Sequence, residues 1–402
     1  MTSRAGRRMM AGTFWVFLSE LVVLPTGILT LAILTRALGP HHYGVFALAV
    51  SFVSWIEWGI SSIYGRAAIK LLSEAADWRP AARSIIRLCG GTGLAAALLL
   101  WIFAPAVARF FREEELLTTL WLLGLDIPIF CLGHAYRAIL VGTGKFRERA
   151  LTSASRWTAR FVLIALFISI GFSVRGAIFA MIGASVVELL VGHINLRLPL
   201  FGERAGSLKA LQGYFLPLFL SSVCFRLFER ADLFTLKALG GSAELAGFYA
   251  AAQNISVVPG LFALSFTPLL LATLSRLRGA GESVKAGRIA RNAVRFALGL
   301  LPFAAVVAGS ALEIVSLIAG PSFLPSSGVL AFLIFAALFV LFISVAATLL
   351  IAAEKPAVTF VLGGPLALLA IAGHLFFIPR FGALGASIVT ASAACLGAGF
   401  FG

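Results

Sequence analysis

The feature that most constrains this chain is a series of apolar runs that continues from one end of the sequence to the other. A helix needs about 20 predominantly apolar residues to cross a lipid bilayer. Turn signals such as Gly39-Pro40 and Gly320-Pro321 separate the runs. The pattern predicts twelve spanning helices, at about 12–35, 44–66, 86–110, 116–142, 150–172, 176–196, 213–238, 245–273, 292–318, 327–353, 356–378 and 383–402.

Composition narrows the class of protein further. Of the 402 residues, 60% are hydrophobic and 12% are charged, and the mean hydropathy is +1.01. Soluble domains carry about 25% charged residues and about 45–50% apolar ones. The chain is therefore predicted to be an all-α polytopic membrane protein. Its four cysteines lie far apart inside apolar runs, so neither a disulfide framework nor a metal site is indicated.

The basic residues predict how the chain is oriented in the membrane. If the N-terminus is cytoplasmic, the cytoplasmic segments hold 21 Lys and Arg residues, the outside segments hold 6, and five lie within predicted spans. Such an excess marks the cytoplasmic side, so both termini are predicted to be cytoplasmic. The net charge of +15 indicates no nucleic-acid partner, because anionic membrane lipid attracts the same basic loops.

The sequence also repeats itself weakly. Residues 36–39 (Arg-Ala-Leu-Gly) recur at 237–240 (Lys-Ala-Leu-Gly), in both cases between the first and second helices of a six-helix half. We therefore predict an N-terminal six-helix lobe at 1–197, a cytoplasmic linker at 198–213 and a C-terminal six-helix lobe at 214–402. Six is an even number, so the two lobes share one orientation and a pseudo-two-fold axis along the membrane normal is predicted.

Four stretches along the whole chain carry a family resemblance. They resemble the polysaccharide-type flippases, the Wzx-like branch of the MOP (multidrug/oligosaccharidyl-lipid/polysaccharide) exporter superfamily. The stretches are Leu34-Thr-Arg-Ala-Leu-Gly-Pro40 with Tyr43-Gly44, Arg230-Ala-Asp232 with Leu239-Gly240 and Gly247-Phe-Tyr249, Glu313 to Gly320 before Phe323, and Ala353-Glu-Lys-Pro356.

The resemblance implies both an architecture and a function. It implies two six-helix lobes around a central cavity, alternating access, and location in a bacterial inner membrane. The implied cargo is a polyprenyl-diphosphate-linked oligosaccharide that moves to the outer leaflet for cell-surface polysaccharide synthesis. Polysaccharide polymerase machinery is an implied partner, and inward movement of a cation is an implied source of energy.

Charged residues inside the spans are the strongest functional candidates, because a charge at the bilayer centre costs about 2.5–3.5 kcal/mol on insertion scales. In the predicted helix 150–172, Arg156 and Arg160 share one face. At about 1.5 Å per residue, Arg160 lies about 15 Å from the cytoplasmic start, near the midplane. Trp157, beside them, is a candidate for stacking on a sugar ring. The alternative role for each arginine is a snorkelling or internally paired side chain.

The predicted helix 213–238 carries a second group of charges. Arg226, Glu229 and Arg230 lie on one side of it, and Asp232 lies about 60° from Glu229. Arg226 lies about 20 Å from the cytoplasmic start. The alternative interpretation is a structural cluster in which Glu229 neutralises an arginine.

Two sets of site residues follow. Arginine offers paired donors that match phosphate, so the predicted cargo-binding set is Arg160, Arg226, Arg156, Arg230 and Trp157. The candidates for coupling an ion, Na⁺ or H⁺, are Asp232, Glu229, Glu57 and Glu20. The histidines His134, His193 and His374 are expected to be packing or interfacial residues.

Two other functions stay open at this point. A cation-coupled multidrug exporter of the same superfamily would have an acidic, aromatic cavity. An integral-membrane glycosyltransferase or ligase would place catalytic residues in large outside loops, and the predicted outside loops are short. The sequence shows no pattern typical of covalent or metal catalysis, so no catalytic residue, bound metal or cofactor is predicted.

Overall fold

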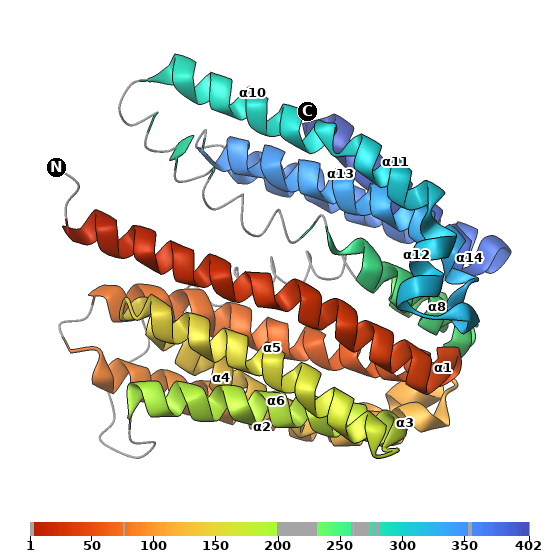
Figure 1. Ribbon diagram of the computed structural model, residues 1–402, viewed down its shortest axis with the longest axis horizontal. Coiled ribbons are helices and arrows are strands. Elements are labelled where there is room, and N and C mark those ends of the chain that lie inside the picture. The colour runs from red at the N-terminus through yellow and green to blue at the C-terminus, as the bar shows by residue number, and fades with distance from the viewer. Residues whose placement is uncertain are drawn as a thin grey trace. The chain divides into compact units, whose positions relative to one another are not determined.

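The computed structural model describes residues 4–74, 77–198, 231–258, 282–352 and 356–401, together with 260, 270, 273–274 and 277. In these residues every regular element is a helix (Figure 1). The chain divides into two compact units. Unit 1 comprises Met1–Leu38 and Val45–Arg226, and unit 2 comprises Gly39–Gly44 and Leu227–Gly402.

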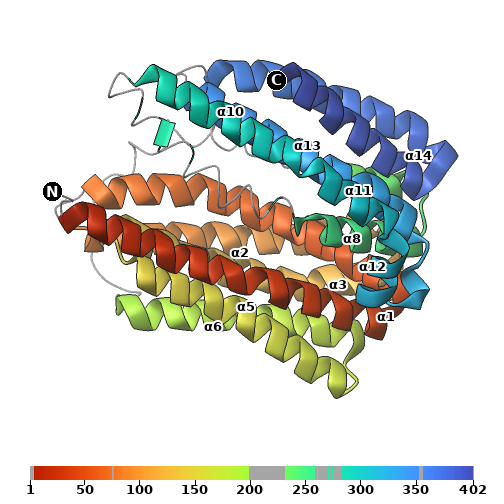
Figure 2. The ribbon, with the colours of Figure 1, turned by 45° about the horizontal axis from the view of Figure 1, so that its top comes forward.

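Six helices form the described part of unit 1. The helices are α1 (Arg4–Glu74, apart from its Gly39–Gly44 segment), α2 (Arg79–Phe110), α3 (Glu114–Gly124), α4 (Asp126–Gly142), α5 (Phe146–Ser169) and α6 (Ser173–Leu196). Helices α5 and α6 run side by side along their length (Figure 2). The core of this unit gathers around Tyr136, Ile139 and Leu140 of α4, which are fully buried.

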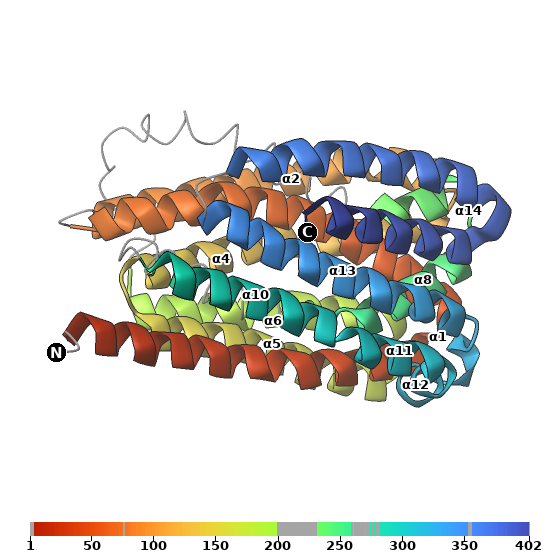
Figure 3. The ribbon, with the colours of Figure 1, turned by 90° about the horizontal axis from the view of Figure 1, so that it is seen from above.

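The described part of unit 2 comprises Gly39–Gly44 of α1 and then a helical segment at 231–238. It continues with α8 (Ala243–Ser256), α10 (Ser283–Gly299), α11 (Leu301–Gly309), α12 (Ala311–Ile318), the 3₁₀ turn η1 (Pro321–Phe323), α13 (Ser326–Ala352) and α14 (Pro356–Phe401). Helix α13 packs against α14 on one side and against α10 and α11 on another (Figure 3). Leu338, Leu341 and Val345 of α13 lie at the centre of this core.

Two of these helices are each a pair of helices joined at a glycine. Gly39 interrupts α1 with φ 70° and ψ 174°, and Gly382 interrupts α14 with φ 56° and ψ −132°. A positive φ is adopted readily by glycine and rarely by other residues. The chain reverses direction within α1 and within α14 (Figure 1), and these glycines are the non-helical residues inside the two helices. They therefore supply the turns predicted between adjacent spans.

Prolines account for two of the breaks that the predicted helices did not include. The predicted helix 116–142 divides into α3 and α4 at Leu125, and the predicted helix 292–318 divides into α10, α11 and α12. A proline clashes with the carbonyl four residues earlier. Pro128 therefore disfavours a continuous helix through Gly124, where α3 ends, and Pro302 does the same near the end of α10.

Length and composition make eight described helices able to cross a membrane. Their apolar stretches are Leu21–Ser62, Arg79–Phe110, Glu114–Gly142, Phe146–Ser169, Ser173–Leu196, Val284–Gly309, Ser326–Leu350 and Pro365–Phe400. The predicted fold class, an all-α polytopic membrane protein, is confirmed. Most of the predicted linker 198–213 lies outside the described residues, so the lobe boundaries and the pseudo-two-fold axis stay predictions.

Candidate functional site

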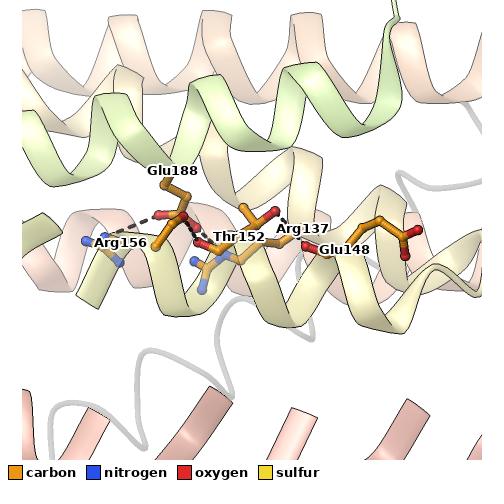
Figure 4. Close-up of polar contacts among 6 residues, drawn as sticks. Arg137, Glu148, Thr152, Arg156 and Glu188 are labelled. Atoms are coloured by element: carbon orange, nitrogen blue, oxygen red, sulfur yellow. Dashed lines mark hydrogen bonds and ion pairs between the residues drawn. The ribbon is translucent and has the colours of Figure 1, made fainter. Parts of the chain in front are cut away.

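Charged side chains from three helices of unit 1 meet at one carboxylate (Figure 4). Arg137 lies on α4, Arg156 on α5 and Glu188 on α6. The Nε of Arg137 lies 2.5 Å from Glu188 Oε1, and the Nε of Arg156 lies 3.2 Å from Glu188 Oε2. Glu188 therefore bridges two arginines and connects three helices.

The two signs of charge in this cluster differ in exposure. The Glu188 side chain is completely buried, whereas the side chains of Arg137 and Arg156 are 19% and 18% exposed. Gly133 lies one turn before Arg137, and a Cβ there would lie 3.2 Å from Glu188 Cγ. A small residue at this position lets α4 and α6 approach closely, so the carboxylate sits deep and the arginines form the accessible part of the cluster.

An aromatic ring lies against the same arginines. The guanidinium carbon of Arg156 lies 4.5 Å from the centroid of the Phe130 ring, and that of Arg137 lies 5.9 Å from it. A cation within about 6 Å of a ring centroid is attracted by the ring face. Phe130 therefore helps to hold both guanidinium groups in place.

Arg160 and Trp157 lie further along α5. The Arg160 guanidinium carbon lies 5.6 Å from the Trp157 ring centroid, and both side chains are partly exposed. Helix α5 begins at Phe146, four residues before its predicted start, so Arg160 lies about 21 Å along the helix instead of about 15 Å. Glu148 in the first turn favours the earlier start, because a negative charge stabilises a helix N-terminus.

Two further carboxylates belong to the same charged region of unit 1. Glu57 of α1 is 5% exposed and Asp126 of α4 is fully buried. Both interact electrostatically with Arg156, Arg160 and Glu188 as well as with each other. The structure thus brings Glu57 of the predicted ion-coupling set together with Arg156 and Arg160 of the predicted cargo set.

Unit 2 contains a separate polar cluster around Asp232. The Tyr249 hydroxyl donates to Asp232 Oδ2 at 2.5 Å, and Gln253 Nε2 donates to the same oxygen at 3.2 Å. The Leu233 N–H donates to Oδ1 at 2.8 Å, and the hydroxyl of Thr390 lies 3.5 Å from Oδ2. Asp232 is 2% exposed and Tyr249 is fully buried, so this is a carboxylate held by several donors away from the surface.

Four of the predicted site residues have no described side chain. Arg226, Glu229 and Arg230 lie outside the described residues, and Glu20 is described only as part of the α1 backbone. Their predicted roles stay predictions. Within the described part of the chain, no group of three or more His, Cys, Asp or Glu side chains is placed to hold a metal ion.

Several residues of both clusters were not among the predicted site residues. In unit 1 these are Arg137 and Glu188, and in unit 2 they are Tyr249, Gln253, Thr390 and His374. Arg137 and Glu188 had a usable signal, because a charge inside a span needs a partner. Tyr249, Gln253 and Thr390 had none, because uncharged polar residues are common in spanning helices.

The fold and the two clusters define a multi-pass membrane protein with charged groups held inside its helix bundles. A family model described as polysaccharide biosynthesis protein matches residues 9–277. The match covers more than half of the sequence, so the chain belongs to the polysaccharide biosynthesis protein family. The family assignment expected from the four sequence stretches, the Wzx-like branch of the MOP superfamily, is confirmed.

Known proteins with similar sequence or structure agree with this assignment. A Shigella flexneri protein with the provisional name O-antigen transporter is 24% identical over 199 residues, which are 46% of this chain and 45% of that relative. The lipid II flippase MurJ, in an inward closed conformation, aligns over 98% of this chain and 86% of its own, with a TM-score of 0.78 and 16% identity.

MATE transporters, one of them described as a multidrug resistance transporter of the MOP superfamily with a TM-score of 0.65, share the fold as well. A MATE transporter of Vibrio cholerae aligns over 98% of this chain and 97% of its own, with a TM-score of 0.65 and 16% identity. At such identities the structures show a common fold and no more. The expectation of a transporter and not an enzyme agrees with the names of all these relatives.

Proposed function

We propose that this protein is an alternating-access flippase that moves a lipid-diphosphate-linked oligosaccharide from the cytoplasmic to the outer leaflet. Membership of the polysaccharide biosynthesis family supports this cargo. The observation that carries the proposal is the arrangement of charge in unit 1, where arginines form the accessible part of the cluster and carboxylates the buried part.

The chemistry of the cargo explains why this arrangement suits it. A diphosphate is strongly hydrated, and a protein that carries it through a membrane must replace that water with donors and positive charge. Arginine does so through a planar fork that binds phosphate oxygens in pairs. Glu188 forms ion pairs with the Nε atoms of Arg137 and Arg156, which keeps both positive charges side by side before the cargo arrives.

Within this proposal the arginines have different roles. Arg160, deeper along α5, contacts phosphate, and Trp157 offers a ring face to sugar. Arg156 contributes charge from a position fixed by Glu188 and Phe130. Arg226 and Arg230, which lie outside the described residues, are proposed to contribute from the predicted helix 213–238.

Movement of a cation is proposed to drive the cycle. Asp232 and Glu57 are the candidates whose side chains are described. Both are buried carboxylates, Glu57 in unit 1 and Asp232 in unit 2. Glu229 and Glu20 remain candidates from the sequence. The proposal also places the protein in a bacterial inner membrane with both termini in the cytoplasm, where polysaccharide polymerase machinery would use the product outside.

Binding of the purified protein to a lipid-diphosphate sugar tests the proposal without reconstitution. Native mass spectrometry is expected to detect a complex that inorganic pyrophosphate weakens and that the uncharged lipid alcohol does not form. Preferential binding of an organic cation, with no complex of the diphosphate lipid, would favour the multidrug alternative. The buried carboxylates Glu57, Asp126 and Glu188 would then be the groups to examine.

A further inference from the structure

A buried imidazole lies close to the Asp232 cluster of unit 2. His374, in the first half of α14, is 3% exposed. Its Nδ1 atom is buried and makes no hydrogen bond among the described residues. Most buried polar atoms in folded proteins are hydrogen-bonded, so an exception in this position calls for a physical explanation.

The packing of α14 on itself brings His374 towards Asp232. A Cβ on Gly373 would lie 2.8 Å from Val389, so the two halves of α14 approach closely at this level. In the sequence, His374 follows Gly373 and Thr390 follows Val389. Thr390 lies 3.5 Å from the Asp232 carboxylate, and Asp232 interacts electrostatically with His374.

Other charged groups on the surrounding elements lie at the ends of those elements. Helix α13, which packs against α14, carries no charged residue. Lys237 lies in the last turn of the helical segment 231–238, Glu244 lies in the first turn of α8, and Arg380 lies two residues before the Gly382 break. Among the described residues of these elements, Asp232 is the charged group that interacts electrostatically with His374, and Tyr249 is its hydrogen-bond donor.

The atoms around Asp232 favour a proton over a sodium ion. Hard cations bind oxygen ligands, usually six or more of them for ions of this size. Here the carboxylate faces the hydroxyl groups of Tyr249 and Thr390, an amide N–H and a backbone N–H, all of which donate to it. The unpaired buried group beside it is an imidazole, which exchanges protons near neutral pH and offers no oxygen.

We propose that His374 and Asp232 form a proton-carrying pair, so that the coupling ion of the transport cycle is H⁺ and not Na⁺. The inference rests on the proposed function for its place in transport. A proton from water on one side binds Nδ1 of His374 and forms an imidazolium that Asp232 stabilises. The same N–H bond breaks when the proton returns to water on the other side, so charge and atoms balance over a cycle.

Titration of the histidines in the purified protein tests the pair without any cargo. The chain has five histidines. A variant in which glutamine replaces His41, His42, His134 and His193 retains His374 as its single histidine, so an NMR spectrum of labelled imidazoles reports on His374. We expect the His374 resonance to titrate with pH. The titration midpoint should move to lower pH in Asp232→Asn, because a neighbouring negative charge is lost. The midpoint should stay unchanged when choline replaces Na⁺. An imidazole that does not titrate, ignores Asp232→Asn or responds to Na⁺ overturns the pair.

Transport in proteoliposomes separates this inference from the proposed function. A pH gradient is expected to accelerate flipping of the diphosphate lipid in the wild type, and His374→Gln to reduce that acceleration about tenfold, a usual size for coupling between sites. His41→Gln, at an exposed histidine, is the matched control and should keep the acceleration. Flipping that is driven by Na⁺ alone would contradict the proton-carrying pair and would still agree with the proposed flippase function. A normal His374 titration with no flipping contradicts the flippase and leaves the pair standing.

Discussion

Glu188 illustrates how a membrane interior holds several charges in one place. The carboxylate is fully buried and touches two arginines from two other helices. A buried ion pair contributes little net stability, but removing one partner leaves the other charge uncompensated. The charged region of unit 1 is therefore sensitive to neutralisation of its central member more than to changes at its exposed edge.

Neutralising Glu188 tests this sensitivity. We expect Glu188→Gln to lower the free energy of unfolding by about 3 kcal/mol, because Arg137 and Arg156 would lose a shared buried counter-charge. Thermal unfolding in detergent, followed by size-exclusion fluorescence, measures the change. Glu313→Gln is the control, since Glu313 is an exposed carboxylate, and it should unfold like the wild type. Equal unfolding temperatures for the two variants would contradict the bridging role.

Replacements of Arg160 test its contact with phosphate. Arg160→Lys keeps the charge and loses the donor fork, so transport should fall and partly survive. Arg160→Ala should remove most transport while the protein inserts and purifies normally. Initial rates of lipid flipping measure both. Near-normal rates for the alanine variant would exclude Arg160 from the cargo site.

Individual residues were predicted from the sequence only in part. Arg156, Arg160 and Glu57 were selected because charge in a span is costly, and the structure brings them into one charged region. The bridge through Glu188 depends on how α4, α5 and α6 align with one another. No local pattern encodes that alignment, because Arg137 and Glu188 lie on helices far apart in the sequence.

Elements were more predictable than residues, because apolar length and glycine turns are local signals. The predicted spans 176–196 and 327–353 correspond closely to α6 and α13. The breaks at Leu125 and Leu300 were not predicted, although Pro128 and Pro302 lie close by. Proline inside a spanning helix produces a break in one place and a tolerated kink in another, because neighbouring helices and side chains can satisfy the freed backbone groups.

A close backbone approach inside unit 2 provides a test at this scale. A Cβ on Gly44 would overlap the Ala243 carbonyl, and one on Gly247 would overlap the Pro40 carbonyl. We expect Gly247→Ala to lower the free energy of unfolding by about 1–3 kcal/mol through overpacking. Gly287→Ala, where a Cβ meets no atom within 4 Å, should be neutral or stabilising by up to about 1 kcal/mol. Thermal unfolding of both variants measures the difference. An unfolding temperature of Gly247→Ala equal to that of the wild type would contradict the close packing.

At the scale of the whole molecule, family membership and fold point to a transporter, and the asymmetry of basic residues predicts its orientation in the membrane. The fold is shared with both a lipid II flippase and a multidrug resistance MATE transporter, so fold alone does not choose the cargo. The choice depends on the charges inside the units. Accessible arginines over buried carboxylates favour an anionic cargo.

Reporter fusions test the predicted topology. A fusion at Arg112 should report the outside and a fusion at Arg204 the cytoplasm, because 21 basic residues fall on one side and 6 on the other. Fusions to alkaline phosphatase detect positions outside the cytoplasm, and fusions to green fluorescent protein detect cytoplasmic positions. The same signal at both positions would contradict the predicted number of spans between them.

The central claim is that this protein carries a lipid-diphosphate sugar across a bilayer. The most direct measurement is the leaflet distribution of a fluorescent lipid-diphosphate sugar in proteoliposomes, read by a quencher that does not cross the membrane. We expect wild-type protein to expose the inner-leaflet pool, Arg160→Ala to leave it protected, and the matching lipid monoalcohol to stay where it started. A pool that remains protected with active, correctly inserted protein would contradict the claim, and so would equal movement of the uncharged lipid.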